Sequence, residues 1–160
     1  MRRSYMDFSA IVLQWLVFGP SGHQRRPEGL VTDNYTLRLP EDYPVSRHVK
    51  TLARGKAITT AGSTPHIINV NGPTCNTRGE TVLSYAEQPI ACHDIMMINH
   101  YFTKSREDWM FKLRRGKADA SHATANPYPD DFYFDVERDA VVEDTRARRY
   151  IPRLRALLSA

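Results

Sequence analysis

The stretch "SAIVLQWLVFGP", residues 9 to 20, decides the fold of this chain. Its β-branched and aromatic residues form an apolar run that stops at Gly19-Pro20, and this pattern predicts a buried strand over residues 9 to 18. Two arginines precede the run in the order of a signal peptide, but polar residues interrupt it and it is too short to span a bilayer. We therefore expect a buried strand and no transmembrane segment.

Further short elements are expected on the C-terminal side of this run. The segment "HVKTLARGKAITTAG" (48–62) predicts two strands around Arg54-Gly55-Lys56, and "PHIINVNG" (65–72) predicts a third that ends at an Asn-Gly turn. "TVLSY" (81–85) is expected to be an edge strand and "DIMMINHYF" (94–102) a buried strand. "LVTDNYTLRL" (30–39) fits either a short strand or a short helix.

Two helices are expected towards the C-terminus. Ser105 with Asp108 fits the S-x-x-D/E capping pattern, and Gly116 is a natural stop for the helix that follows. Residues 119 to 130 read as a loop. From Val141 the pattern predicts an arginine-rich helix that is interrupted or restarts at Pro152, with Glu143-Asp144 supplying negative charge to its first turn.

Composition places these elements in one globular domain. The chain has 160 residues, of which 41% are hydrophobic and 25% charged. We expect a mixed α/β (α+β) fold over residues 1–160, with a short mixed sheet and terminal helices. The motif-bearing part spans residues 12–144 and the C-terminal helical tail residues 141–160.

The net charge and the cysteine content indicate which binding partners and which cellular compartment to expect. The net charge is +4, and the excess lies in two basic clusters. Such clusters suit phosphates or a peripheral contact with an anionic membrane surface, or they are solvated helix faces. Aromatic residues are not interleaved in a nucleic-acid module pattern, so nucleic acid is not an expected partner. Two cysteines without CxxC spacing fit a reducing, cytoplasmic compartment. The clusters are Lys112, Arg114, Arg115 and Lys117, and Arg146, Arg148, Arg149, Arg153 and Arg155.

Histidines near predicted strand ends are the candidates for chemistry. His100 follows an apolar run and precedes Lys104 and Ser105, where a helix N-terminus favours anions. It is either a ligand of a metal or phosphate, or a structural histidine. His23 lies in a glycine-bracketed loop that lacks P-loop spacing. The remaining pattern-based interpretations are structural: His48 and His66 as structural histidines, and Asp130-Asp131 as a solvated loop.

Five segments together resemble a known family. In order they are "QWLVFGPSGHQRRPEGLVTDNYTLR" (14–38), "RHVKTLAR" (47–54), "PHIINVNG" (65–72), "INHYFTKSREDWMFKLRRGKAD" (98–119) and "VVED" (141–144). This ordered set resembles the C-terminal half of family 2 glycosyltransferases, in the subgroup close to family 92. The resemblance covers about residues 12 to 144.

The resemblance implies a GT-A fold and a metal-assisted glycosyltransferase. Such enzymes move a sugar from a nucleotide diphosphate donor to a hydroxyl of a glycan or other acceptor, with a divalent cation, Mn²⁺ or Mg²⁺, at an Asp-x-Asp motif. A carboxylate takes the acceptor proton, and no residue here is assigned to that role. By the resemblance, His100 contacts the metal or diphosphate, and Lys104 and Ser105 lie near the donor phosphates. The acceptor side comprises Trp15, Phe18, Ser21, Gly22 and His23.

The sequence departs from the family pattern at two points. Pro20 stands where the family has a serine, and no Asp-x-Asp-like strand end precedes residue 12. We therefore expect a fragment that is active only when an upstream nucleotide-binding half completes it. The alternative is a non-catalytic remnant of that fold that binds glycans or a partner chain.

Overall fold

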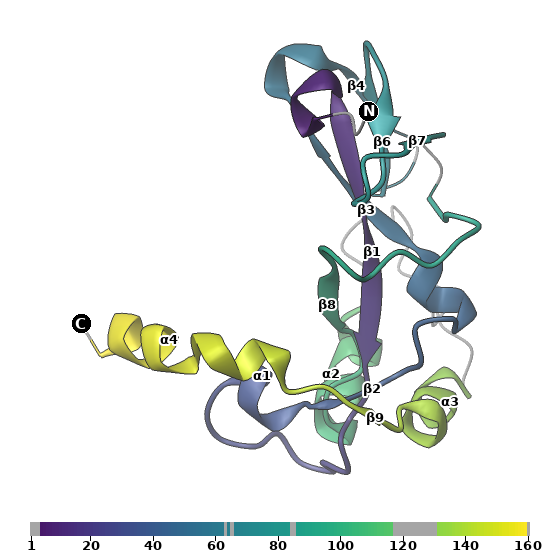
Figure 1. Cartoon of the computed structure of the whole chain (residues 1–160). Helices are drawn as coiled ribbons and strands as arrows, with labels where there is room; N and C mark the ends of the chain where they lie inside the picture. The colour runs from purple at the N-terminus through teal and green to yellow at the C-terminus, as the bar shows by residue number, and fades with distance from the viewer. Residues whose placement is uncertain (1–3, 63, 65, 84–85, 117–130, 160) are drawn as a thin grey trace. The chain divides into compact units, whose positions relative to one another are not determined.

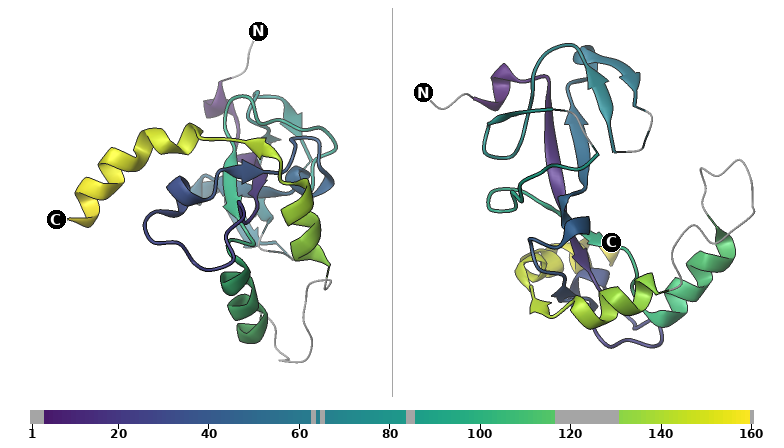
Figure 2. Two further views of the ribbon diagram at one scale, coloured as in Figure 1. Left: turned by 90° about the horizontal axis from the view of Figure 1, so that it is seen from below. Right: turned by 90° about the vertical axis from the view of Figure 1, so that its right-hand side faces the viewer.

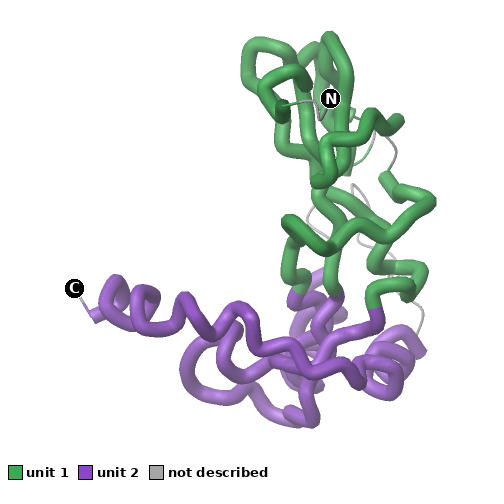
Figure 3. The backbone as a smooth tube through the Cα atoms, viewed as in Figure 1, with its two compact units in different colours: residues 1–16, 41–100 green, residues 17–40, 101–160 purple. Residues whose placement is uncertain are grey.

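The computed structural model describes residues 4–62, 64, 66–83, 86–116 and 131–159. They form a mixed α/β structure with a mixed sheet and a few helices (Figure 1). The chain divides into two compact units, shown in different colours in Figure 3. Unit 1 comprises Met1–Leu16 and Glu41–His100, and unit 2 comprises Val17–Pro40 and Tyr101–Ala160.

The long strand β1 (Ala10–Phe18) confirms the central prediction from the sequence. In unit 1 it pairs antiparallel with β3 (Val49–Ala53), from Ala10 opposite Ala53 to Gln14 opposite Val49. It pairs parallel with β6 (Thr74–Cys75), and it also pairs with β8 (Ile98–Tyr101). Its residues from Gln14 onward are all buried, so both faces of the strand are covered there.

The remaining strands of unit 1 are short. β7 (Thr81–Val82) pairs antiparallel with β6, and β4 (Ile58–Ala61) pairs with β5 (Ile68–Val70) in a separate two-stranded sheet. Single-turn 3₁₀ helices lie at Tyr5–Asp7, Pro44–Arg47 and Gly55–Ala57. The two strands expected around Arg54-Gly55-Lys56 are confirmed as β3 and β4. The strand expected over residues 94 to 102 is confirmed only in its final part, β8.

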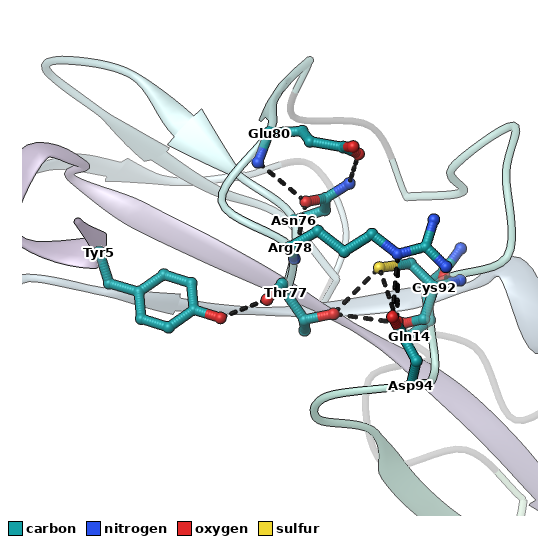
Figure 4. A network of polar contacts seen from close by, with 8 residues as sticks. All are labelled: Tyr5, Gln14, Asn76, Thr77, Arg78, Glu80, Cys92 and Asp94. Carbon is teal, nitrogen blue, oxygen red and sulfur yellow. Dashed lines mark hydrogen bonds and ion pairs between the residues drawn. The ribbon is translucent and has the colours of Figure 1, made fainter. Parts of the chain in front are cut away.

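A polar network attaches the irregular segment around Cys92 to β1 (Figure 4). The buried Gln14 side chain donates to the carbonyl of Ile90 over 2.9 Å and accepts from the amide of Cys92. The Thr77 hydroxyl lies 3.0 Å from the Cys92 sulfur, and the Arg78 guanidinium pairs with Asp94 at 3.1 Å. The network explains why a segment without regular structure is held against the strand.

Unit 2 continues from the end of β1. Phe18 lies opposite Arg38 of β2 (Leu37–Arg38), and β2 pairs antiparallel with β9 (Val142–Glu143). The stretch 30–39, left open by the sequence, contains both a short helix, α1 (Val31–Asn34), and β2. At the end of β1, a Cβ on Gly19 would lie 2.6 Å from the Cβ of Ala140, so only glycine allows this close approach.

The helices of unit 2 surround an aromatic core. α2 (Arg106–Arg115) begins after Ser105 and ends at Gly116, where φ is 73°, and both predicted ends are confirmed. α3 (Phe132–Asp139) was not predicted. The almost fully buried ring of Trp109 on α2 lies 6.0 Å from the rings of Phe132 and Tyr133. These contacts hold α2 and α3 together.

The predicted helix from Val141 is wrong over its first residues. Val142–Glu143 forms strand β9, because its backbone pairs with the edge of β2. Asp144, expected at the first turn of the helix, is instead buried and paired with Arg38. Helical structure begins with the 3₁₀ helix Arg146–Tyr150, called η4, and continues as α4 (Ile151–Leu158), with Pro152 in the first turn as predicted.

Asp130-Asp131 were expected to lie in a solvated loop. Asp131 is exposed, in a turn that directly precedes α3, whereas Asp130 and the predicted loop of residues 119–130 lie outside the described residues. None of the helices in the described part of the chain is long and apolar enough to cross a membrane.

Candidate functional site

Three histidines surround one tryptophan in unit 1. The ring centroid of Trp15 lies 5.2 Å from that of His48, 5.0 Å from that of His66 and 4.0 Å from that of His100. His48 stacks on the indole, whereas His100 meets it edge-on. The rings of His48 and His66 are 5.6 Å apart. We call these four residues the Trp15 histidine cluster.

Backbone pairing in unit 1 places these rings together. The amide of Trp15 donates to the carbonyl of His48 over 2.9 Å, so His48 sits beside the indole at the start of β3. The Thr51 hydroxyl donates to the carbonyl of His66 over 2.8 Å and holds the turn before β5. His100 lies on β8, which pairs with β1. The residue before β3, the turn before β5 and strand β8 therefore converge on the indole.

Hydrogen bonds define the tautomer of His66 and hold the ring of His48 in place. Nδ1 of His66 donates to the carbonyl of Val49 over 2.9 Å, so its neutral ring keeps Nε2 as an acceptor. Burial lowers the pKa of His66, and the nearby charges of Lys50 and His48 lower it further. His48 directs Nδ1 at the carbonyl of Val45, 3.2 Å away, and Nε2 at Glu87, 3.1 Å away. Both ring nitrogens of His48 are therefore engaged by groups of unit 1.

The cluster presents a mixture of groups suited to hydroxyl and phosphate oxygens. Lys50 Nζ lies 5.8 Å from the centroid of the Trp15 ring. It supplies positive charge, while Nε2 of neutral His66 supplies an acceptor. The three histidines are partly exposed, but the indole beneath them is buried. A ligand here would therefore meet the edges of the imidazoles first.

A second group of predicted residues meets within unit 2, at the junction between the loop after β1 and the start of α2. The amide of Arg106 donates to the carbonyl of His23 over 3.1 Å, and that of Glu107 to the carbonyl of Gln24 over 3.0 Å. The Ser21 hydroxyl accepts from the amides of Thr36 and Leu37, both at 3.0 Å. We call this group the loop–helix junction.

The backbone at the junction adopts left-handed conformations. φ is 49° at Ser21, 78° at Gly22 and 55° at Lys104. A left-handed non-glycine residue is disfavoured, so the hydrogen bonds around Ser21 must hold it in place. The His23 ring Nε2 lies 3.1 Å from the carbonyl of Asn34, to which it donates, and the ring packs edge-on against Tyr35. The loop is thus fixed by contacts within unit 2.

The first amides of α2 already have partners. The amide of Ser105 donates to the Tyr35 hydroxyl over 3.2 Å, and that of Asp108 donates to the Ser105 hydroxyl over 3.1 Å. With the amides of Arg106 and Glu107 bonded to the preceding loop, the helix start offers no unpaired amide at residues 105–108. The role of Ser105 at a phosphate stays a prediction, and its observed role is to cap α2.

Lys104 lines a cavity of about 250 Å³ in unit 2, together with Arg26, Tyr35 and Asp108. The Arg26 guanidinium pairs with the Asp108 carboxylate at 2.5 Å. Burial acts to raise the pKa of Asp108, but hydrogen bonds from Arg26 and Ser105 outweigh it and lower that pKa. Asp108 therefore remains ionised and offsets one of the two cations that line the cavity.

The predicted site residues are thus divided between the two units. Trp15 and His100 meet in unit 1, whereas Ser21, Gly22 and His23 meet the segment around Ser105 in unit 2. Phe18 is buried in unit 2, with its ring 4.8 Å from that of Tyr101, which indicates a packing role. The phosphate and acceptor roles assigned from the resemblance stay predictions.

Four residues beside these sites were not singled out as site residues from the sequence. His48 and His66, interpreted as structural histidines, both contact Trp15, and that interpretation stays a prediction. Their position in segments that carry the family resemblance was the available signal. Tyr35, which bonds to the helix start, carried no signal. His93 was also missed: its buried Nε2 donates to the carbonyl of Trp15 over 2.8 Å, and its Nδ1 has no partner in the described part of the chain.

A metal site is not complete within these residues. No group of three or more histidine, cysteine or acidic side chains in the described ranges is arranged to hold a metal ion. The role of His100 as a metal ligand stays a prediction.

No protein-family model matches this chain, and no curated protein or solved structure matches it significantly.

Proposed function

We propose that this chain is the acceptor-side portion of a glycosyltransferase related to family 2, with a GT-A-like fold. In its complete form the enzyme transfers a sugar from a nucleotide diphosphate donor to an acceptor hydroxyl. The supporting observation is the Trp15 histidine cluster. Trp15, His48, His66 and His100 each come from a different one of the first four segments that carry the resemblance, and their rings meet within 4.0 to 5.6 Å.

The chemistry of the cluster suits this function. Sugar hydroxyls both donate and accept hydrogen bonds, and Nε2 of His66 can accept one while the Lys50 ammonium can donate another. Diphosphate oxygens accept only, and they are attracted to the positive charge of Lys50. His100 lies at the edge of the same indole and is the proposed contact to the donor diphosphate.

The nucleotide-binding portion is proposed to supply the rest of the catalytic machinery. A divalent cation, Mn²⁺ or Mg²⁺, would be held there by carboxylates, with His100 as a single additional ligand. When bound, the cation offsets the charge of the departing diphosphate. The base that takes the acceptor proton is not assigned to any residue of this chain.

Metal-dependent binding of nucleotides tests the proposal. Uridine and guanosine diphosphates are titrated calorimetrically into the protein with Mg²⁺ or Mn²⁺. We expect weak binding, with a dissociation constant of about 1 mM, that is lost in His100→Ala. Lys50→Ala should weaken binding about fivefold by removing one cation near the indole. Lys56→Ala is the matched control, since this exposed lysine lies in the turn before β4.

Two outcomes would contradict the proposal. One is the absence of any nucleotide binding that depends on the metal. The other is binding that His100→Ala leaves unchanged, or that Lys50→Ala and Lys56→Ala weaken equally. Circular dichroism of each variant ensures that a loss of binding is not a loss of folding.

A non-catalytic binding module is the second candidate, and exposed apolar side chains in unit 1 favour it. Leu52, Leu83 and Ile90 are all exposed, as surfaces that meet a partner commonly are. Light scattering coupled to size-exclusion chromatography distinguishes the two candidates. A monomer that binds nucleotide supports the enzyme, whereas self-association or glycan binding without nucleotide or metal supports the module.

A further inference from the structure

The C-terminal segment Arg146–Leu158 has an unusual charge distribution. It comprises η4 and α4, which form one run to the C-terminal end in Figure 1 and in the left-hand view of Figure 2. Five of its residues are arginines, and residues 145–160 include no aspartate or glutamate. We call Arg146–Leu158 the C-terminal arginine helix. It is therefore the most consistently positive stretch of unit 2.

The apolar residues of this helix lie along one stripe. Tyr150, Leu154, Leu157 and Leu158 follow the i, i+4, i+7 and i+8 spacing of a single helix face. Ile151, beside this stripe, is buried and anchors the helix to unit 2. The outer part of the stripe is uncovered, since Tyr150 is 53% exposed, Leu157 67% and Leu158 75%. Three large apolar side chains thus face outward along one line.

Ion pairs hold one side of the helix and leave cations on the other. Asp33 of α1 pairs with Arg148 and with Arg155, each at 3.2 Å, and Asp144 pairs with Arg146. No ion pair of Arg149 or Arg153 occurs among the described residues, and both are exposed. By helical spacing, Arg149 and Arg153 stand one turn apart, and Arg153 lies next to the stripe between Tyr150 and Leu157.

We propose that the C-terminal arginine helix is a docking surface for an anionic lipid bilayer. An interfacial helix places leucines and aromatic rings at the boundary with the acyl chains, while arginines meet lipid phosphates. The stripe supplies the first group, and Arg149 and Arg153 supply the second. The attachment to Asp33 keeps the opposite side of the helix on the protein. Nucleic acid would use the same arginines but gives no role to the exposed leucines.

Vesicle flotation tests this surface on the full chain. The protein is mixed with vesicles of phosphatidylcholine alone or of phosphatidylcholine with phosphatidylserine, at low salt. We expect flotation only with the anionic vesicles. The double variant Leu157→Ser/Leu158→Ser should bind about tenfold more weakly, because two side chains that enter the interface are lost. Arg149→Gln/Arg153→Gln should weaken binding about tenfold as well.

Matched control variants distinguish binding through this surface from flotation caused by the overall charge or hydrophobicity of the protein. Leu52→Ser/Leu83→Ser removes two exposed leucines of unit 1, and Arg25→Gln/Lys56→Gln removes two cations elsewhere. Both controls should float like the wild type. The substituted side chains of the helix are all exposed, so thermal melts should be unchanged in the variants.

Three results would overturn the proposal. The first is no flotation with anionic vesicles. The second is binding that depends on the arginines but not on the leucines, together with equally tight binding of a DNA duplex, which would indicate a nucleic-acid surface. The third is loss of flotation in the two control variants as well, which would indicate adsorption without a defined surface.

Discussion

The Trp15 histidine cluster and the loop–helix junction arise from the same kind of sequence motif but use their polar groups differently. At the junction, the Ser21 hydroxyl and the amides at the start of α2 all bond to other groups of unit 2. In the cluster, Nε2 of His66 has no hydrogen bond within the described residues. The difference indicates that the observed hydrogen bonds of the junction act as a scaffold for unit 2, whereas the cluster retains a group that can meet a ligand. The phosphate and acceptor roles of the junction residues stay predictions.

The largest effect is expected at a buried ion pair of unit 2. Asp144 pairs with Arg38 at 2.8 Å, and the two side chains are only 3% and 10% exposed. Asp144→Asn leaves the Arg38 charge buried without its partner, so we expect the free energy of unfolding in urea to fall by about 3 kcal/mol. Asp135→Asn breaks an exposed pair with Arg138 and should cost under about 1 kcal/mol. Equal costs would refute this account of the scaffold.

The same ion pair has a consequence at acid pH. Hydrogen bonds from Arg146 hold the pKa of Asp144 well below its usual range, and those from Arg38 act in the same direction against the effect of burial. A depressed pKa stabilises the protein above the ordinary pKa of aspartate, and this contribution is lost as the pH falls towards the folded-state pKa. Urea titrations below pH 4 should therefore show a weaker loss of stability in Asp144→Asn than in the wild type.

An intermediate effect is expected at the junction. Ser105→Ala removes the cap of α2 and should lower the free energy of unfolding by about 1 kcal/mol. Ser159→Ala alters an exposed serine at the end of α4 and should change it by less than about 0.5 kcal/mol. If Ser105→Ala cost no more than Ser159→Ala, the junction would not be a scaffold. Chemical unfolding monitored by tryptophan fluorescence gives both values.

The smallest effect is expected at His66 in the cluster. The pKa of His66 is lowered from 6.5 in the folded protein. Between the folded-state pKa and 6.5, the unfolded chain therefore binds a proton while the folded ring stays neutral. This contribution is fully present above pH 6.5 and declines as the pH falls towards the folded-state pKa. His66→Asn can keep the donor to the Val49 carbonyl but cannot titrate. Its stability should therefore fall less between pH 7 and pH 5 than that of the wild type.

Patterns within a single segment predicted the elements whose ends are set by residues of that same segment. The apolar run ending at Gly19-Pro20 predicted β1, and a serine cap with a glycine stop predicted α2. Neither of these two sequence signals involves residues from a distant segment. β9 was predicted as helix because its formation depends on β2, whose place beside it is set by tertiary pairing. The buried pair between Asp144 and Arg38 follows from the same pairing and has no local signal.

The candidate site shows the same limit. The sequence identified Trp15 and His100 through the family resemblance, and the structure places their rings 4.0 Å apart. His48 and His66 join them only because the register of β3 and the turn before β5 bring them to the indole. The sequence of one segment alone does not indicate which residues of other segments will pack against it. The resemblance assigned ligands by position, whereas the structure shows which side chains are neighbours.

Side-chain NMR of the histidines tests the central claim most directly. Protein with ¹⁵N-labelled imidazoles is titrated with uridine and guanosine diphosphate sugars in the presence of Mg²⁺. We expect the resonances of His48, His66 and His100 to shift together with one dissociation constant, while those of His23 and His93 stay in place. Unchanged cluster resonances, or shifts confined to His23, would contradict a ligand site at the Trp15 histidine cluster.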